Sequence, residues 1–207
     1  MHFKIAKSAQ SYFNNIMNLE GSHAAEDKNK FIQFDVYYCC ALIGMAAGQI
    51  DEDTSELKDL VERYPVQYRD CKAQIAGLLV ASEARRLGID TQSPKLEQIM
   101  LQYLSNNDTL LSEDGIKTLN AYALKGYRLI TDYPLFDKPT SREEFLDAFN
   151  VAMQFYEKKD SYLEKKNMYL FRQDHNHPSF VVYVEAVNEV YNRYFNRGGG
   201  YSVQSIF

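Results

Sequence analysis

The sequence predicts an all-α fold: a multi-helix bundle followed by a C-terminal helical extension and a short flexible tail. Apolar residues recur at spacings of three and four along most of the 207 residues, which is the period of amphipathic helices. Apolar residues also make up 45% of the chain, enough for a sizeable core. After position 157 the composition becomes more charged. We therefore expect a helical body over residues 1–157 and an aromatic-rich helical extension and tail over residues 158–207.

The most apolar stretch runs from Phe34 to Ile50 and predicts the central helix of the bundle. Its apolar and small residues cover nearly the whole surface of a helix, so we expect burial on several sides and an end near Gly48. The stretch is shorter than the roughly 20 apolar residues that span a bilayer. A polar run follows Met1–Ile5, where a signal peptide would have an apolar segment. These observations predict a cytoplasmic protein without membrane contact.

Helices are also expected on both sides of the central one. The first covers Ile5 to Leu19 and ends where Gly21 breaks the apolar spacing. A short acidic helix is expected from Thr54, as its N-cap, to about Arg63. Further helices are expected from Pro65 to Leu87, from Pro94 to Leu104, from Glu113 to Ile130 and from Ser141 to Tyr156.

Local signals mark the ends of several of these helices. Gly88 suits a C-terminal stop, and Ser112 suits an N-cap. Gly126 is expected to interrupt the helix that contains it, because glycine disfavours helix interiors. Thr140 and Ser141 each precede a glutamate by three residues, which is the spacing of a capping box.

The three cysteines, Cys39, Cys40 and Cys71, are too few for a disulfide framework. Adjacent positions on a helix point about 100° apart, so Cys39 and Cys40 do not suit a shared metal ion. We expect all three to be small apolar residues of the core, in preference to a thiol nucleophile or a redox site.

A candidate metal site is the segment Asp174–Pro178, which contains His175 and His177. Two histidines one residue apart can both bind zinc, but a zinc site needs three or four protein ligands, and no cysteine pair accompanies them. A polar loop is the favoured interpretation. Acidic residues also gather at Asp51–Asp53 and in the following helix, without the pattern of a calcium loop. A solvated acidic helix start, able to face a basic partner, explains them best.

Basic residues suggest a second candidate site. Arg69, Lys72, Arg85 and Arg86 lie on or near one predicted helix and could face DNA phosphates if they shared one side of it. Acidic residues stand close to them in the sequence, and the formal net charge of −5 provides no general attraction to DNA. An ordinary helix surface is the favoured interpretation, and a DNA-facing patch is the alternative.

Aromatic residues are the most informative feature of the extension. Apolar residues keep helical spacing from Phe180 to Tyr194, and the glycines at 198–200 end regular structure before an apolar tail. Tyrosine is enriched at protein interfaces. We expect this region either to dock onto another chain or to pack on its own body, with docking slightly favoured. The residues expected to bind the partner are Tyr191, Tyr194, Tyr201, Ile206 and Phe207.

The sequence lacks the common enzyme motifs, which favours a protein that is not an enzyme and needs no cofactor. The sequence contains no Gly-x-Ser-x-Gly, no dinucleotide fingerprint and no Cys-x-x-Cys. The glycines at 198–200 lack the Lys-Ser/Thr pair of a phosphate-binding loop.

Several short segments give the chain a family resemblance. Phe34–Tyr38 runs into Ala41–Gly48, and Tyr64–Pro65, Leu119–Ala123 and Gly126–Tyr127 follow. Across residues 30–135 the chain resembles small helical accessory subunits of bacterial anti-phage defence systems that contain an SMC-like ATPase. Lamassu-type systems are nearest, ahead of DNA phosphorothioation systems. The resemblance implies a non-enzymatic subunit that binds the ATPase, and it carries no catalytic residue.

The leading hypothesis is therefore an accessory subunit of a multi-protein defence complex. Its partners would be the SMC-like ATPase and, in some arrangements, an effector nuclease, with DNA contacted through the complex. Two alternatives stay open: a metal-dependent hydrolase that uses His175 and His177, and a stand-alone helical DNA-binding regulator that uses Arg85 and Arg86.

Overall fold

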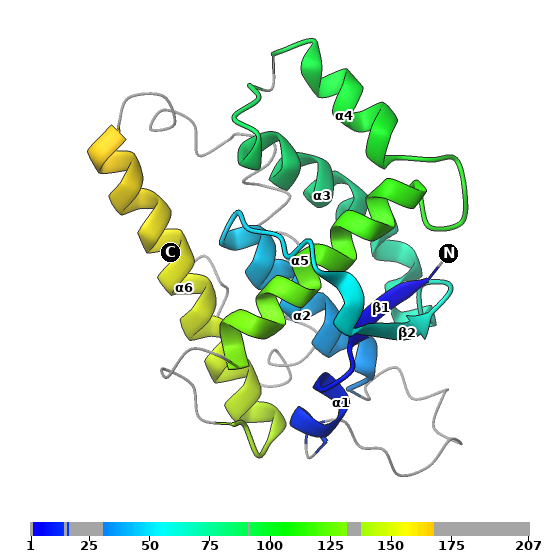
Figure 1. Cartoon of the computed structure of the whole chain (residues 1–207), viewed down its shortest axis with the longest axis vertical. Coiled ribbons are helices and arrows are strands. Elements are labelled where there is room, and N and C mark those ends of the chain that lie inside the picture. The colour runs from blue at the N-terminus through cyan, green and yellow to red at the C-terminus, as the bar shows by residue number, and fades with distance from the viewer. Residues whose placement is uncertain (1, 15, 17–30, 91, 132–137, 168–207) are drawn as a thin grey trace.

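The computed structural model describes residues 2–14, 16, 31–90, 92–131 and 138–167, with the backbone alone from 157 to 167. Most of this part of the chain is helical, and a small two-stranded sheet accompanies the helices (Figure 1). In chain order the elements are β1 (Phe3–Ala6), α1 (Ala9–Tyr12), α2 (Gln33–Ala46), the 3-10 helix η1 (Thr54–Glu56), β2 (Leu57–Val61), the 3-10 helix η2 (Val66–Cys71), α3 (Lys72–Arg86), α4 (Lys95–Tyr103), α5 (Glu113–Thr131) and α6 (Arg142–Asn167).

Helix α2 forms the centre of the molecule, as its sequence predicts. Every residue from Phe34 to Ala46 is buried, because α5 crosses one side of the helix while α3 and α6 flank it (Figure 1). The N-terminus of α2 is fixed by Asp35, whose carboxylate accepts hydrogen bonds from the Ile32 backbone N–H and from the Tyr68 hydroxyl, each at 2.5 Å. A buried carboxylate at a helix N-terminus is stabilised by the backbone N–H groups and the helix dipole.

Helices α2 and α5 approach closely at two glycines. A Cβ atom at Gly126 would overlap the carbonyl oxygen of Cys40, and a Cβ atom at Gly44 would overlap the carbonyl oxygen of Tyr122. The expected interruption at Gly126 is wrong, since α5 continues through this residue to Thr131. The glycine is needed for backbone contact between two helices and does not end either of them.

Two other glycines end helices, as predicted. Gly48 and Gly88 adopt φ values of +62° and +64°, in the left-handed region that glycine tolerates best. The following N–H groups of Gln49 and Ile89 then bond back to the carbonyls of Gly44 and Ala84, at 3.1 and 2.8 Å. This is the Schellman arrangement at a helix C-terminus.

Two predicted helices are wrong, because parts of their sequences form the two strands of the sheet. Residues expected to begin a helix from Ile5 to Leu19 form strand β1, and α1 is a single turn. The helix expected from Thr54 to Arg63 is also wrong. This segment forms η1, which is capped by Asp53, and then β2. The two strands are antiparallel, with Ile5 opposite Lys58. The fold is therefore mostly helical but not all-α.

A side chain of α5 forms hydrogen bonds with the edge of β1 that does not pair with β2. The Asn120 Oδ1 atom accepts a hydrogen bond from the Lys4 backbone N–H at 2.9 Å, and Asn120 Nδ2 donates to the His2 carbonyl at 3.1 Å. These two backbone groups belong to alternate residues, so they point to the same edge of the strand. Asn120 Oδ1 also accepts from the buried Tyr37 hydroxyl of α2 at 2.9 Å. One amide thus joins β1, α2 and α5.

The segment formed by η2 and α3, and the helices α4 and α5, agree closely with their predicted ranges, whereas α6 extends to Asn167, beyond its predicted end at Tyr156. Ser112 caps α5, since its Oγ accepts from the Gly115 N–H at 3.0 Å. Ser141 caps α6 by accepting from the Glu144 N–H at 3.2 Å, while the Glu144 carboxylate accepts from both the N–H and the hydroxyl of Thr140 at 2.7 Å. Helix α6 continues through Lys158, where the sequence suggests a boundary between body and extension. None of the described helices is long and apolar enough to cross a membrane.

Candidate functional site

The four basic residues of the alternative DNA-facing patch lie toward opposite ends of α3. Lys72 begins the helix and Arg69 precedes it, whereas Arg85 and Arg86 end it. With a rise of 1.5 Å per residue, the two pairs are roughly 20 Å apart. The guanidinium of Arg85 donates to the carbonyls of Met45 and Ala46, where the negative end of the α2 dipole favours a cation.

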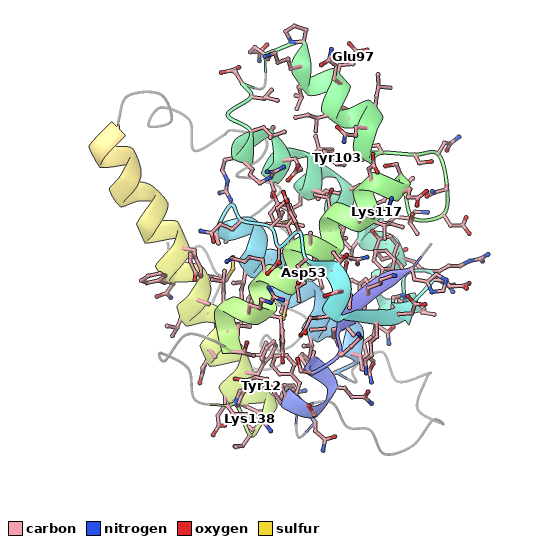
Figure 2. The ribbon with its side chains drawn as sticks, in the orientation of Figure 1. Tyr12, Asp53, Glu97, Tyr103, Lys117 and Lys138 are labelled. Carbon is pink, nitrogen blue, oxygen red and sulfur yellow. The ribbon has the colours of Figure 1, made fainter. Side chains whose placement is uncertain are left out.

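Arg86, which is exposed, binds a polar cluster centred on a buried carboxylate of the same helix. Its guanidinium donates two hydrogen bonds of 2.8 Å to the carboxylate of Glu83, which is completely buried. Glu83 also accepts from the hydroxyls of Tyr122 on α5 at 2.6 Å and Tyr103 on α4 at 3.0 Å. Figure 2 labels Tyr103 at the end of α4, from which it reaches this cluster.

The surroundings of Glu83 explain its charge state. Burial alone would raise the pKa of the carboxyl, but the hydrogen bonds from Arg86, Tyr122 and Tyr103 outweigh this effect and hold the pKa below its usual value. Burial, together with the neighbouring Glu83 charge, raises the pKa of both tyrosines. The cluster is thus an ionised carboxylate with four donated hydrogen bonds. It joins α3, α4 and α5 rather than presenting a reactive group.

The acidic residues near β2 are used in separate contacts. Asp51 pairs with Arg128 of α5, and Asp53 accepts from the Ser55 N–H at 3.1 Å to cap η1. His2 lies between Asp59 and Glu62, with its two ring nitrogens 3.1 and 3.3 Å from their carboxylates. Within the described residues, no three His, Cys, Asp or Glu side chains converge in a way that could hold a metal ion.

The three cysteines are buried, as predicted, and contribute to the core. Burial raises the pKa of the Cys39 and Cys40 thiols, and mutual repulsion adds to this for Cys39. A raised pKa disfavours the thiolate, which is the reactive form of cysteine.

Three rings gather beside the N-terminal strand. Phe3 lies 5.3 Å from Phe34 and 4.9 Å from Tyr64, measured between ring centroids. The Tyr64 hydroxyl is buried and makes no hydrogen bond within the described part of the chain, and burial raises its pKa. The Tyr64–Pro65 segment of the family resemblance therefore contributes to the core.

Several predicted site residues lie outside the described residues. These are the candidate metal ligands His175 and His177 and the expected partner-binding residues Tyr191, Tyr194, Tyr201, Ile206 and Phe207. The predicted helix from Phe180 to Tyr194 and the glycines at 198–200 also belong to this segment.

Helix α6 has two apolar sides. One side packs on the body, and its buried residues are Phe145, Leu146, Phe149, Ala152, Met153 and Tyr156. The other side carries Val151 and Phe155, whose exposed fractions are 54% and 41%. The sequence predicts the first side. The sequence analysis does not predict the second side, although the sequence contains a signal for it: Val151 and Phe155 are apolar and four residues apart in the same helix.

The two halves of α6 differ in their relation to the body. Just before α6 begins, Lys138 Nζ lies 5.8 Å above the centre of the Tyr12 ring, and both residues are labelled at the foot of the molecule in Figure 2. The buried side chains of α6 run from Phe145 to Tyr156, which is also the last residue of the helix whose side chain the structure describes. Beyond it the helix continues to Asn167, and in Figure 1 this end lies clear of α2, α3 and α5.

Comparison of the chain with protein-family models, with curated proteins and with solved structures found no match.

Proposed function

We propose that this protein is a non-enzymatic interaction subunit of a cytoplasmic multi-protein assembly, and that it binds its partner through the region that follows α6. The observation that carries the proposal is the course of α6. The buried residues of α6 from Phe145 to Tyr156 anchor the helix on the body, and in Figure 1 its C-terminal end lies clear of α2, α3 and α5. A helix whose end lies away from the body suits a role in reaching another molecule.

The sequence of those residues supports the same interpretation. Tyr191, Tyr194, Tyr201, Ile206 and Phe207 are large apolar or amphipathic residues of the kinds that supply interface energy. The buried ionisable side chains described above also support a structural role for the body. Glu83 accepts hydrogen bonds from Tyr103 of α4 and Tyr122 of α5, and Asp35 accepts one from Tyr68 of η2.

For the partner, we propose an SMC-like ATPase of a bacterial anti-phage defence system, as the family resemblance implies. An effector nuclease or DNA would then be engaged through the assembled complex. The resemblance covers residues 30–135 and includes Gly126, the residue at which α5 meets the Cys40 carbonyl of α2.

The proposal is tested by deleting residues 201–207 and measuring which proteins co-purify with the chain from its native cells. We expect the full chain to retain a long coiled-coil ATPase and the shortened chain to lose most of it, with an unchanged urea midpoint for unfolding. Leu101→Ser on α4 is the matched control, because Leu101 is 75% exposed and lies on another helix. Equal recovery of the ATPase with the full and shortened chains would contradict the proposal.

A further inference from the structure

The exposed side of α6 has a composition that suits pairing with a helix. Val151 and Phe155 are four residues apart and therefore lie on one side of the helix, with the half-buried Ala148 one turn before Val151. Phe155 also contacts the ring of Tyr156, with 5.1 Å between centroids. Exposed apolar residues at such spacing form the kind of stripe that packs against another helix.

The charges along α6 are distributed unevenly. Before Phe155 the helix contains three acidic residues and one arginine: Arg142, Glu143, Glu144 and Asp147. After Phe155 it contains four lysines: Lys158, Lys159, Lys165 and Lys166. Helical periodicity places these four positions on the side of Val151 and Phe155, and places the acidic positions 157, 160 and 164 on the opposite side. The apolar pair thus stands between an acidic start and a basic end.

We propose that a second copy of this chain covers this side of α6, with the two helices antiparallel and related by a two-fold axis near Phe155. Phe155 is close to the midpoint of the 26-residue helix, so this arrangement overlaps α6 along its full length. The two-fold axis places the acidic start of each helix opposite the basic end of the other. Asp147 of one copy then lies beside positions 158 and 165 of the other.

Parallel pairing of the same two helices would place lysines beside lysines and acidic residues beside acidic residues. Like charges directly opposite each other destabilise a helix pair. The charge order of α6 therefore favours the antiparallel arrangement, which is also the symmetric one in which both copies use the same surface. It places Asn167 of the two copies at opposite ends of the pair, so both following regions can still bind a partner protein.

The first test is sedimentation of the purified full chain by itself, over a range of concentrations. We expect a reversible dimer whose dissociation constant rises about tenfold or more in the double variant Val151→Ser, Phe155→Ser. Leu101→Ser, with its exposed position on α4, should leave the dissociation constant unchanged. A wild-type chain that stays monomeric at every concentration would overturn the proposal.

A charge exchange tests the antiparallel order. Asp147→Lys and the double variant Lys158→Glu, Lys165→Glu should each weaken the dimer about tenfold, because each creates repulsion at both ends of the pair. An equimolar mixture of the two variants should recover the wild-type affinity. In the mixed dimer, position 147 of each copy again faces positions 158 and 165 of opposite charge in the other copy. A mixture that stays as weak as its components would refute this arrangement. Co-purification of the ATPase is a separate measurement, so this proposal and the proposed function can fail independently.

Discussion

Glu83 illustrates how single residues stabilise this molecule. It is an acidic residue at a fully buried position, where an unpaired carboxylate would be strongly destabilising. Two hydrogen bonds from Arg86 and one from each of two tyrosines compensate the loss of hydration. Because the tyrosines come from α4 and α5, the charge of one side chain on α3 helps to position three helices.

This arrangement predicts a large effect for Glu83→Gln. The variant keeps the size of the side chain but loses the charge, so the contact with the Arg86 guanidinium and both tyrosine hydrogen bonds weaken. We expect a loss of about 2–4 kcal/mol in the free energy of unfolding at neutral pH. Urea denaturation of the two proteins gives the difference directly. Tyr103→Phe is the matched control, since it removes one of the four hydrogen bonds and should cost about 1 kcal/mol.

The same variant should show a defined pH dependence. The folded pKa of Glu83 lies below its unfolded value, so its ionised form stabilises the native state above the unfolded pKa. This contribution is lost as the pH falls from about 4.3 through the lower folded pKa. The stability difference between wild type and Glu83→Gln should therefore be largest near neutral pH and shrink in acid. A difference that stays constant down to the acid-unfolding region would contradict this account.

The role of Glu83 could not be read from the sequence. In the sequence, Glu83 is one of several acidic residues that stand close to basic residues such as Arg85 and Arg86. Local spacing identifies which side of α3 carries Glu83, but it does not show that Tyr103 and Tyr122 approach that side from other helices. The burial of Cys39 and Cys40, in contrast, follows from their place in the strongly apolar segment Phe34–Ile50. Partners distant in the chain are therefore the part of the candidate site that single-sequence reasoning missed.

At the scale of whole elements, the contact of α2 with α5 is the central packing feature. The two helices touch through their backbones, because Gly44 and Gly126 each leave room for a carbonyl of the opposite helix. Such close contact brings the surrounding side chains of both helices into a single core. It also removes any tolerance for an added methyl group at either glycine.

Gly126→Ala should therefore separate the helices even though alanine is the better helix former. The added Cβ would overlap the Cys40 carbonyl, which is rigid backbone and cannot move without shifting α2. We expect a loss of about 3 kcal/mol or more, against a gain of about 1 kcal/mol in helix propensity. Thermal or urea unfolding measures the net loss. Gly88→Ala is the control: its Cβ meets no atom within 4 Å, so only the cost of its positive φ, about 1 kcal/mol, is expected.

The elements also show where prediction succeeds. Helices α2, α5 and α6 were predicted because each combines apolar spacing with local end signals such as Gly48, Ser112 and Ser141. Strand β2 was missed because Leu57, Leu60 and Val61 have helical spacing. The strand forms through pairing with β1, more than fifty residues earlier in the chain, and local spacing contains no information about that pairing.

At the scale of the whole molecule, the described elements share one core. Buried residues from β1, α2, α3, α4, α5 and α6 belong to a single apolar cluster, so the body has no internal division into separate packing units among its described residues. A body of this kind is expected to unfold in one cooperative step. The three cysteines allow this to be measured, because two lie in α2 and the third ends η2.

We expect a thiol reagent such as Ellman's reagent to modify none of the three cysteines in the native protein and all of them in concentrated guanidinium chloride. All three side chains are buried, and burial raises the pKa of Cys39 and Cys40, so access requires opening of the core. If the core opens as one unit, the three thiols should become reactive at the same denaturant concentration. This concentration should equal the midpoint of unfolding measured by circular dichroism. Single-cysteine variants, with the other two replaced by alanine or serine, assign each signal. Reaction of Cys71 at lower denaturant than Cys39 and Cys40 would show instead that the η2–α3 region opens before α2, and would contradict a single cooperative core.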